Sequence, residues 1–86
     1  MGWSVRIKNS AAKEVAAIPQ PARGRIIEAI DSLGEQPLAG APLRGALRGL
    51  RRVRVGDYRI VYQALDDEMV VLVVRAAHRR DVYRRA

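Results

Sequence analysis

Cysteine and phenylalanine are absent from this 86-residue sequence, and histidine and tryptophan occur once each. Without cysteine the chain forms no disulfide and offers neither a thiolate nucleophile nor a thiolate metal ligand. The one histidine, His78, argues against a zinc site, because such sites draw on several histidine, cysteine or carboxylate ligands. We therefore expect a protein that works without a metal ion and without a cofactor.

Long hydrophobic runs are also missing. The apolar stretch at residues 69–74 is far shorter than the roughly 20 residues of a membrane-spanning helix. The first residues lead directly into an alternating segment and lack the apolar core of a signal peptide. We expect a cytoplasmic protein with no membrane partner. The length supports one domain, residues 1–86, and a hydrophobic content of 49% is too high for a disordered chain.

Acidic residues are few compared with basic ones. Nine Asp and Glu stand against 16 Lys and Arg, which gives a net charge of +7. Lysine occurs only twice, so most of the positive charge is carried by arginine, whose planar guanidinium suits bidentate contacts to phosphate. This imbalance predicts attraction to a polyanion, either a nucleic acid or an acidic protein.

The first half of the chain predicts one strand and two helices. Apolar and polar residues alternate over residues 3–8, as in a half-buried strand. A helix is expected over residues 11–18, where Pro19 ends it, and a second over residues 21–33. We expect Gly34 to terminate the second helix in the left-handed conformation. The two helices form a helical hairpin.

Residues 50–62 predict a β-hairpin, because they alternate with period two on both sides of a Gly-Asp turn. The two-residue turn fixes the register: Val55 pairs with Tyr58, Arg54 with Arg59, Val53 with Ile60 and Arg52 with Val61. Three arginines then share one face of the hairpin. Like charges directly opposite each other destabilise a sheet by roughly 0.2–1 kcal/mol, and an anionic ligand would offset that cost.

The remaining segments complete the predicted fold. Residues 35–46 contain two prolines and two glycines and read as a loop, which Leu38 and Leu43 anchor to the core. A buried strand follows at residues 69–75, and residues 76–86 predict a short C-terminal helix. The fold class is α+β, a twisted antiparallel sheet with an N-terminal helical hairpin, in the order βααβββ.

The C-terminal segment adds candidate functional side chains to the basic hairpin face. Arg79 lies one helical turn before Tyr83, whose ring can stack on a base and whose hydroxyl can donate to a phosphate. Alternatively, Tyr83 packs against the sheet as an anchor. His78 can exchange a proton near neutral pH, or it is structural. The arginines themselves can form a solvated face without a ligand.

These features resemble the RelE/ParE superfamily of toxins from bacterial toxin–antitoxin pairs. The resemblance rests on the opening strand, the helical hairpin, the proline-bearing loop, residues 50–62 and residues 78–84. It implies a microbial-RNase-like antiparallel sheet with two helices on one side. The RelE branch cleaves messenger RNA in the ribosomal A site without a metal, by attack of the ribose 2′-hydroxyl on the adjacent phosphate. The ParE branch inhibits DNA gyrase without cutting RNA.

The resemblance also implies roles for individual residues. Arg52 and Arg54 match the basic pair of the first hairpin strand, and would grip and neutralise phosphates. Arg59 would stabilise the transition state, and Arg79 with Tyr83 would orient the nucleotide. The expected catalytic set is Arg54, Arg59, Arg79, Tyr83 and His78. The expected RNA-binding set is Arg51, Arg52, Arg75, Arg80 and Arg84.

Two residues are candidates for the general base. Arg52 and Arg54 stand where some active relatives have lysine, and arginine holds its proton too firmly to act as a base. His78 is one substitute, and Tyr83 is the other if the surrounding arginines stabilise its phenolate.

The implied partners are a cognate antitoxin with an acidic segment, the ribosome and its mRNA, with the antitoxin forming a hetero-oligomer. Two alternatives stand beside the RNA-cleaving toxin. One is a ParE-like, non-catalytic inhibitor of DNA gyrase. The other is an inactive basic module that only binds RNA or its antitoxin.

Overall fold

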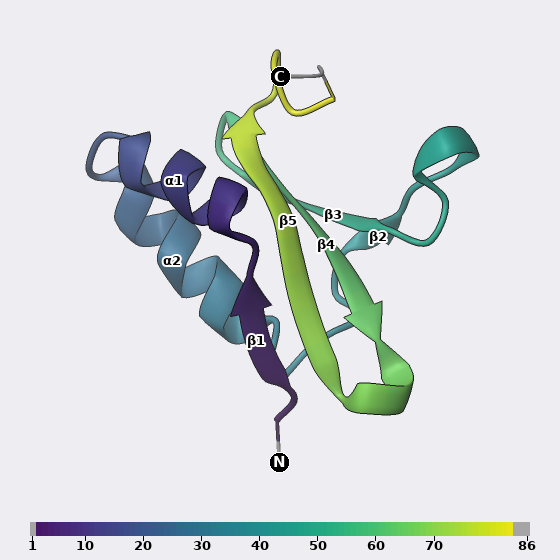
Figure 1. Cartoon of the computed structure of the whole chain (residues 1–86). Coiled ribbons are helices and arrows are strands. Elements are labelled where there is room, and N and C mark those ends of the chain that lie inside the picture. Colours follow the sequence, from purple (N-terminus) through teal and green to yellow (C-terminus); the bar gives the residue numbers. More distant parts are fainter. Residues whose placement is uncertain (1, 84–86) are drawn as a thin grey trace.

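In the computed structural model, which describes residues 2–83, two helices cover one face of a five-stranded sheet (Figure 1). The elements in chain order are β1 (Ser4–Ile7), α1 (Asn9–Ala17), α2 (Ala22–Ser32), β2 (Ala41–Pro42), β3 (Arg51–Val55), β4 (Tyr58–Leu65) and β5 (Val70–His78). Short 3-10 turns, η1 (Gly45–Leu47) and η2 (Asp66–Glu68), precede β3 and β5. The predicted α+β class is confirmed.

The sheet order is β1-β5-β4-β3-β2, and the strands are antiparallel except at one edge. There β1 runs parallel to β5, so the sheet is mixed and not purely antiparallel as expected. The difference has a simple cause. Alternation identifies a strand but says nothing of its direction, and the partner of β1 is the last strand of the chain.

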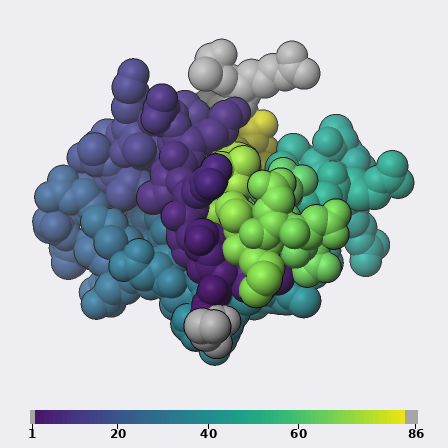
Figure 2. All heavy atoms as spheres, turned by 60° about the horizontal axis from the view of Figure 1, so that its bottom comes forward, coloured from purple at the N-terminus to yellow at the C-terminus, as the bar shows by residue number. Residues whose placement is uncertain are grey.

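The core lies between the helices and the sheet. Ala11 and Val15 of α1 are one turn apart and buried, as are Ile26 and Ile30 of α2, so each helix buries one stripe. The sheet contributes Ile60, Tyr62, Val71, Val73 and Ala76 to the same cluster. Full burial of each large apolar side chain stabilises the fold by roughly 1.5–3 kcal/mol. Figure 2, in which the connection between β4 and β5 comes forward in green, shows the N-terminal segment in purple packed beside it and the η1 region in teal at the right.

Gly34 follows α2 but does not adopt the expected left-handed conformation. It is buried beneath β1, where the Trp3 N–H donates to its carbonyl at 2.7 Å. A Cβ at this position would lie 2.8 Å from the Trp3 carbonyl oxygen and 3.2 Å from a Val5 methyl group. Glycine is therefore required here because two backbone segments approach closely.

The loop before β2 is held by polar contacts. The buried Tyr62 hydroxyl donates to the Pro37 carbonyl at 2.8 Å and accepts from the Gly40 N–H at 2.9 Å. The Arg51 guanidinium donates to the Gly40 carbonyl at 2.7 Å. Leu38, expected to anchor this loop, is 64% exposed. The anchoring of the loop therefore comes from its backbone groups.

No helix forms over the described part of the C-terminal segment. β5 continues through His78 because Ala76 and His78 pair with β4, and the ladder takes the backbone groups that a helix would use. Residues 79–83 form consecutive turns, in which the Val82 N–H donates to the His78 carbonyl at 3.0 Å. The expected short helix is therefore absent up to residue 83.

Within residues 2–83, no helix has the length and apolar character needed to cross a membrane.

The Tyr62 contacts predict a stability effect. Tyr62→Phe keeps the ring but leaves the buried Gly40 N–H without its acceptor, which costs about 1–3 kcal/mol of unfolding free energy. Urea denaturation measures this loss, and amide exchange at Gly40 should accelerate. Tyr58→Phe is the control, because the described residues offer its hydroxyl no hydrogen bond. Equal stability of the two variants would contradict the assignment.

Candidate nucleic-acid interface

The β3–β4 hairpin has the register that the sequence predicts. Its pairs are Arg51 with Tyr62, Arg52 with Val61, Val53 with Ile60, Arg54 with Arg59 and Val55 with Tyr58. Ile60 is in the core, so its alternating neighbours point away from the helices. Val61 also pairs with Arg75 of β5. We call the helix-free side that carries Arg52, Arg54, Arg59 and Arg75 the arginine face.

Three side chains of this face differ in their surroundings. Arg54 is exposed. Arg59 is half-buried, and its guanidinium donates to the carbonyls of Gly56 at 3.0 Å and Tyr58 at 2.9 Å, which holds it beside the hairpin turn. The Nε of Arg52 is buried without a hydrogen-bond partner among the described residues. Of the three side chains, Arg54 is therefore the most accessible to a ligand.

A hollow of about 170 Å³ includes Arg75 of the arginine face in its wall. Its lining residues are Leu47, Leu50, Val61, Val74, Arg75, Val82 and Tyr83. Val82 is 3% exposed and Tyr83 is 49% exposed. Val82 therefore anchors the C-terminal segment to the sheet, while the ring of Tyr83 stays accessible at the hollow. The two roles considered for Tyr83, functional group and packing anchor, therefore predict different stability effects for its removal.

His78 lies on the other side of the sheet. It pairs with Tyr58, on the helix side, and the two rings meet edge to face with centroids 5.7 Å apart. Its Nδ1 accepts the Arg80 N–H at 3.2 Å, so a neutral His78 carries its proton on Nε2. The structure thus brings Arg52, Arg54, Arg59 and Tyr83 to one face but does not bring His78 to it.

The remaining predicted residues are placed as follows. Arg51 pairs with Tyr62 on the helix side and holds the loop before β2, so it does not join the arginine face. Arg79 and Arg80 are exposed in the turn after β5. The Arg79 N–H donates to the Asp57 carbonyl at 2.7 Å, which ties this turn to the hairpin. Arg84 lies outside the described residues.

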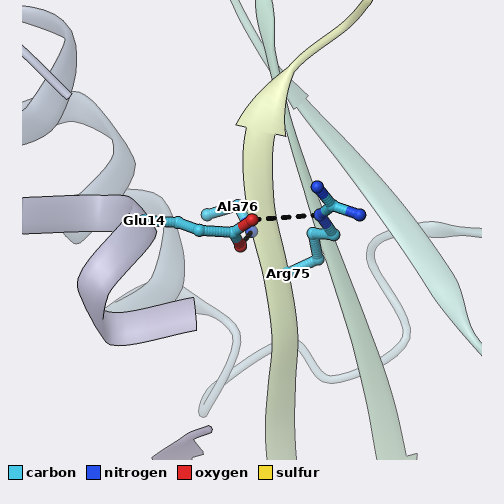
Figure 3. Close-up of polar contacts among 3 residues, drawn as sticks. All are labelled: Glu14, Arg75 and Ala76. Carbon is cyan, nitrogen blue, oxygen red and sulfur yellow. Dashed lines mark hydrogen bonds and ion pairs between the residues drawn. The ribbon is translucent and has the colours of Figure 1, made fainter. Parts of the chain in front are cut away.

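Sequence reasoning missed one residue at the edge of this site, Glu14. Its carboxylate bonds both the Arg75 Nε at 3.0 Å and the Ala76 N–H at 2.9 Å (Figure 3). No motif in the sequence indicates this contact, because 61 positions separate Glu14 from Arg75.

A metal site is not evident in the described part of the chain: residues 2–83 hold no group of three or more histidine, aspartate or glutamate side chains arranged to bind a metal ion.

Comparison with known proteins places this architecture. Residues 5–83 match the family model described as the ParE toxin of the type II toxin–antitoxin system parDE. Two relatives come from Mycobacterium tuberculosis. Toxin RelG is 34% identical, over 99% of this chain and 100% of its own, and toxin RelE is 32% identical, over 95% and 87%.

Solved structures agree with this assignment. In the toxin–antitoxin complex RelBE2 of Mycobacterium tuberculosis, the matching chain is 29% identical with a TM-score of 0.84, over 91% of this chain and 99% of that one. In the archaeal RelE–RelB complex of Pyrococcus horikoshii, the matching chain is 25% identical with a TM-score of 0.76. The match covers 95% of this chain and 100% of that one. The family model, the two relatives and the shared fold therefore define a toxin of the type II toxin–antitoxin class. The chain belongs to the RelE/ParE toxin superfamily.

Val82 and Tyr83, at the end of the described chain, predict different stability effects: substitution of Val82 should destabilise the protein, and substitution of Tyr83 should not. Tyr83→Ala should change the unfolding free energy by no more than about 0.5 kcal/mol, because its ring is half exposed. Val82→Asp places a charge in a buried site and should release the terminal segment. Thermal unfolding and limited proteolysis measure both. A Tyr83→Ala variant as protease-sensitive as Val82→Asp would make Tyr83 an anchor after all.

Proposed function

We propose that this toxin is a RelE-like endoribonuclease that cleaves ribosome-bound mRNA without a metal ion. The observation that carries the proposal is the joint placement of Arg52, Arg54, Arg59 and Tyr83 on the helix-free face of the sheet. The superfamily resemblance assigns these four residues, together with Arg79 and His78, to RNA binding and cleavage. The names of the two mycobacterial relatives, RelG and RelE, add support.

The arginines supply electrostatic stabilisation. Arg52 and Arg54 grip the RNA backbone, and Arg54 is exposed to it. Arg59 is already fixed beside the turn by two carbonyl contacts, so it needs little reorganisation when charge grows on the scissile phosphate. Preorganised donors of this kind often contribute the largest single share of catalysis.

The reaction that fits these groups is an internal transfer. The ribose 2′-oxygen loses its proton and attacks the adjacent phosphorus while the bond from phosphorus to the 5′-oxygen breaks. The products are a 2′,3′-cyclic phosphate and a 5′-hydroxyl, and the leaving oxygen takes up a proton. Two residues are candidates for moving the proton. Tyr83 is favoured over His78, because Tyr83 lies at the hollow on the arginine face and His78 lies on the other side of the sheet.

The protein partner of this surface is a cognate antitoxin. Both structures named above are toxin–antitoxin complexes. An acidic segment of the antitoxin would cover the arginine face and block the RNA, because charge complementarity speeds and specifies such association. The site of action is the cytoplasm, on translating ribosomes.

Gyrase inhibition is the second candidate, and the match to the ParE family model favours it. The deciding experiment is induced expression of the toxin, with mapping of mRNA 5′ ends and a gyrase supercoiling assay in parallel. We expect new 5′ ends within translated codons and normal supercoiling. Inhibited supercoiling with intact mRNA would replace the proposal by the ParE-like one.

Two arginines should separate binding from chemistry. Arg52→Ala is expected to weaken RNA association and to lower the slope of affinity against salt by about one, as for one lost phosphate contact. Arg59→Ala is expected to keep binding and to slow single-turnover cleavage by about 10²–10³-fold. Arg25→Ala on the exposed side of α2 is the matched control for charge. Unchanged cleavage by Arg59→Ala would show that the scissile phosphate does not lie beside the hairpin.

The Tyr83 hydroxyl is tested by a conservative change. If it moves a proton, Tyr83→Phe should slow cleavage by about 10²–10⁴-fold with stability unchanged. If the ring only stacks on a base, Tyr83→Phe should stay active, and Tyr83→Ala should lose about 1–3 kcal/mol of RNA binding. Rates measured at saturating substrate distinguish the two outcomes.

A further inference from the structure

The free edge of β5 is where Glu14 acts. β1 pairs with β5 only as far as Val73, and beyond that point α1 takes its place beside the strand (Figure 1). The Glu14 side chain leaves α1 at this level, and its Oε1 accepts the Ala76 N–H at 2.9 Å. The Glu14 carboxylate thus accepts a hydrogen bond from a backbone N–H that has no neighbouring strand on this side.

The second oxygen of the same carboxylate bonds the side chain of the preceding residue. Glu14 Oε2 accepts the Arg75 Nε–H at 3.0 Å (Figure 3). The side chains of Arg75 and Glu14 are 26% and 29% exposed, so solvent screens this ion pair less than a fully exposed one. The Ala76 N–H lies at the edge of the strand, whereas the Arg75 side chain belongs to the arginine face, so one carboxylate links this sheet edge to the arginine face.

Arg75 also lines two hollows. One contains Tyr83, Val82 and Val61 on the arginine face, and the other, of about 310 Å³, contains Glu14 and His78 at the α1 edge. The Arg75 side chain is therefore part of the wall between α1 and the proposed RNA site. Glu14 holds this side chain through Nε.

We propose that Glu14 is a positioning residue for RNA cleavage, which holds the Arg75 guanidinium at the rim of the hollow that contains Tyr83. This inference rests on the proposed RNA-cleaving function. It has a distinctive consequence, because Glu14 also brings a negative charge toward bound phosphates. The residue therefore opposes RNA binding while it improves the geometry of the bound complex, and its loss should move affinity and rate in opposite directions.

Glu14→Gln separates this role from simple capping of the strand. The glutamine amide has one acceptor oxygen, which can keep the Ala76 N–H, and an NH₂ group, which cannot accept from the Arg75 Nε–H. The substitution thus removes the carboxylate contact to the Arg75 Nε and can preserve the cap on the Ala76 N–H. Glu28→Gln, on the exposed side of α2, makes the same change in net charge and serves as control.

The experiment measures affinity for ribosome-bound mRNA and single-turnover cleavage for wild type, Glu14→Gln, Arg75→Gln, the double variant and Glu28→Gln. We expect Glu14→Gln to bind more tightly than wild type and to cleave on the order of 10- to 10²-fold more slowly, since small misplacements carry such costs. The double variant should cleave no more slowly than Arg75→Gln. Glu28→Gln should match wild type.

Nitrogen-15 NMR of the Arg75 Nε–H gives a readout that does not depend on cleavage. In wild type this proton should exchange slowly with solvent, and in Glu14→Gln it should exchange fast. Fast exchange in Glu14→Gln with wild-type cleavage would overturn the proposal, as would additive losses in the double variant. A wild-type protein that binds ribosomes but cuts no RNA would instead overturn the proposed function, whatever the NMR result.

Discussion

The pairing of β3 with β4 is the constraint on which the site depends. A two-residue turn, with Gly56 at a φ of 59°, sets the register of five residue pairs. A slip of one residue would send Arg52 and Arg54 toward the helices and Val53 toward solvent. The apolar side chains of Val53 and Ile60 prevent that slip, since they would lose their burial. Core packing on one face therefore fixes the arginines on the other, including the repulsive pair Arg54 and Arg59.

Local pattern was enough to predict this hairpin, because turn chemistry and alternation are both written within residues 50–62. The helices were also predictable to within two residues, since each carries a buried stripe and lies near a proline. The arginine face followed from the register alone. The catalytic roles of these residues come from family resemblance and stay predictions.

What the sequence did not reveal depends on contacts between distant segments. The parallel pairing of β1 with β5, the close approach over Gly34 and the link from Glu14 to Arg75 each join residues far apart in the chain. The C-terminal segment was predicted as helix because its local spacing allowed one. Residues 76–78, the first of that segment, instead pair with β4 as part of β5. A local pattern does not indicate whether a segment bonds to itself as a helix or to a distant strand as part of a sheet.

The division of labour between the two faces of the sheet has an evolutionary consequence. The side chains that hold the fold together lie mainly between helices and sheet, whereas Arg54 and Tyr83 are exposed on or beside the arginine face. Surface substitutions of this kind cost little folding energy. The same scaffold can therefore drift in target or lose its toxicity without first losing its structure. This evolvability suits a superfamily in which one fold serves unrelated cellular targets.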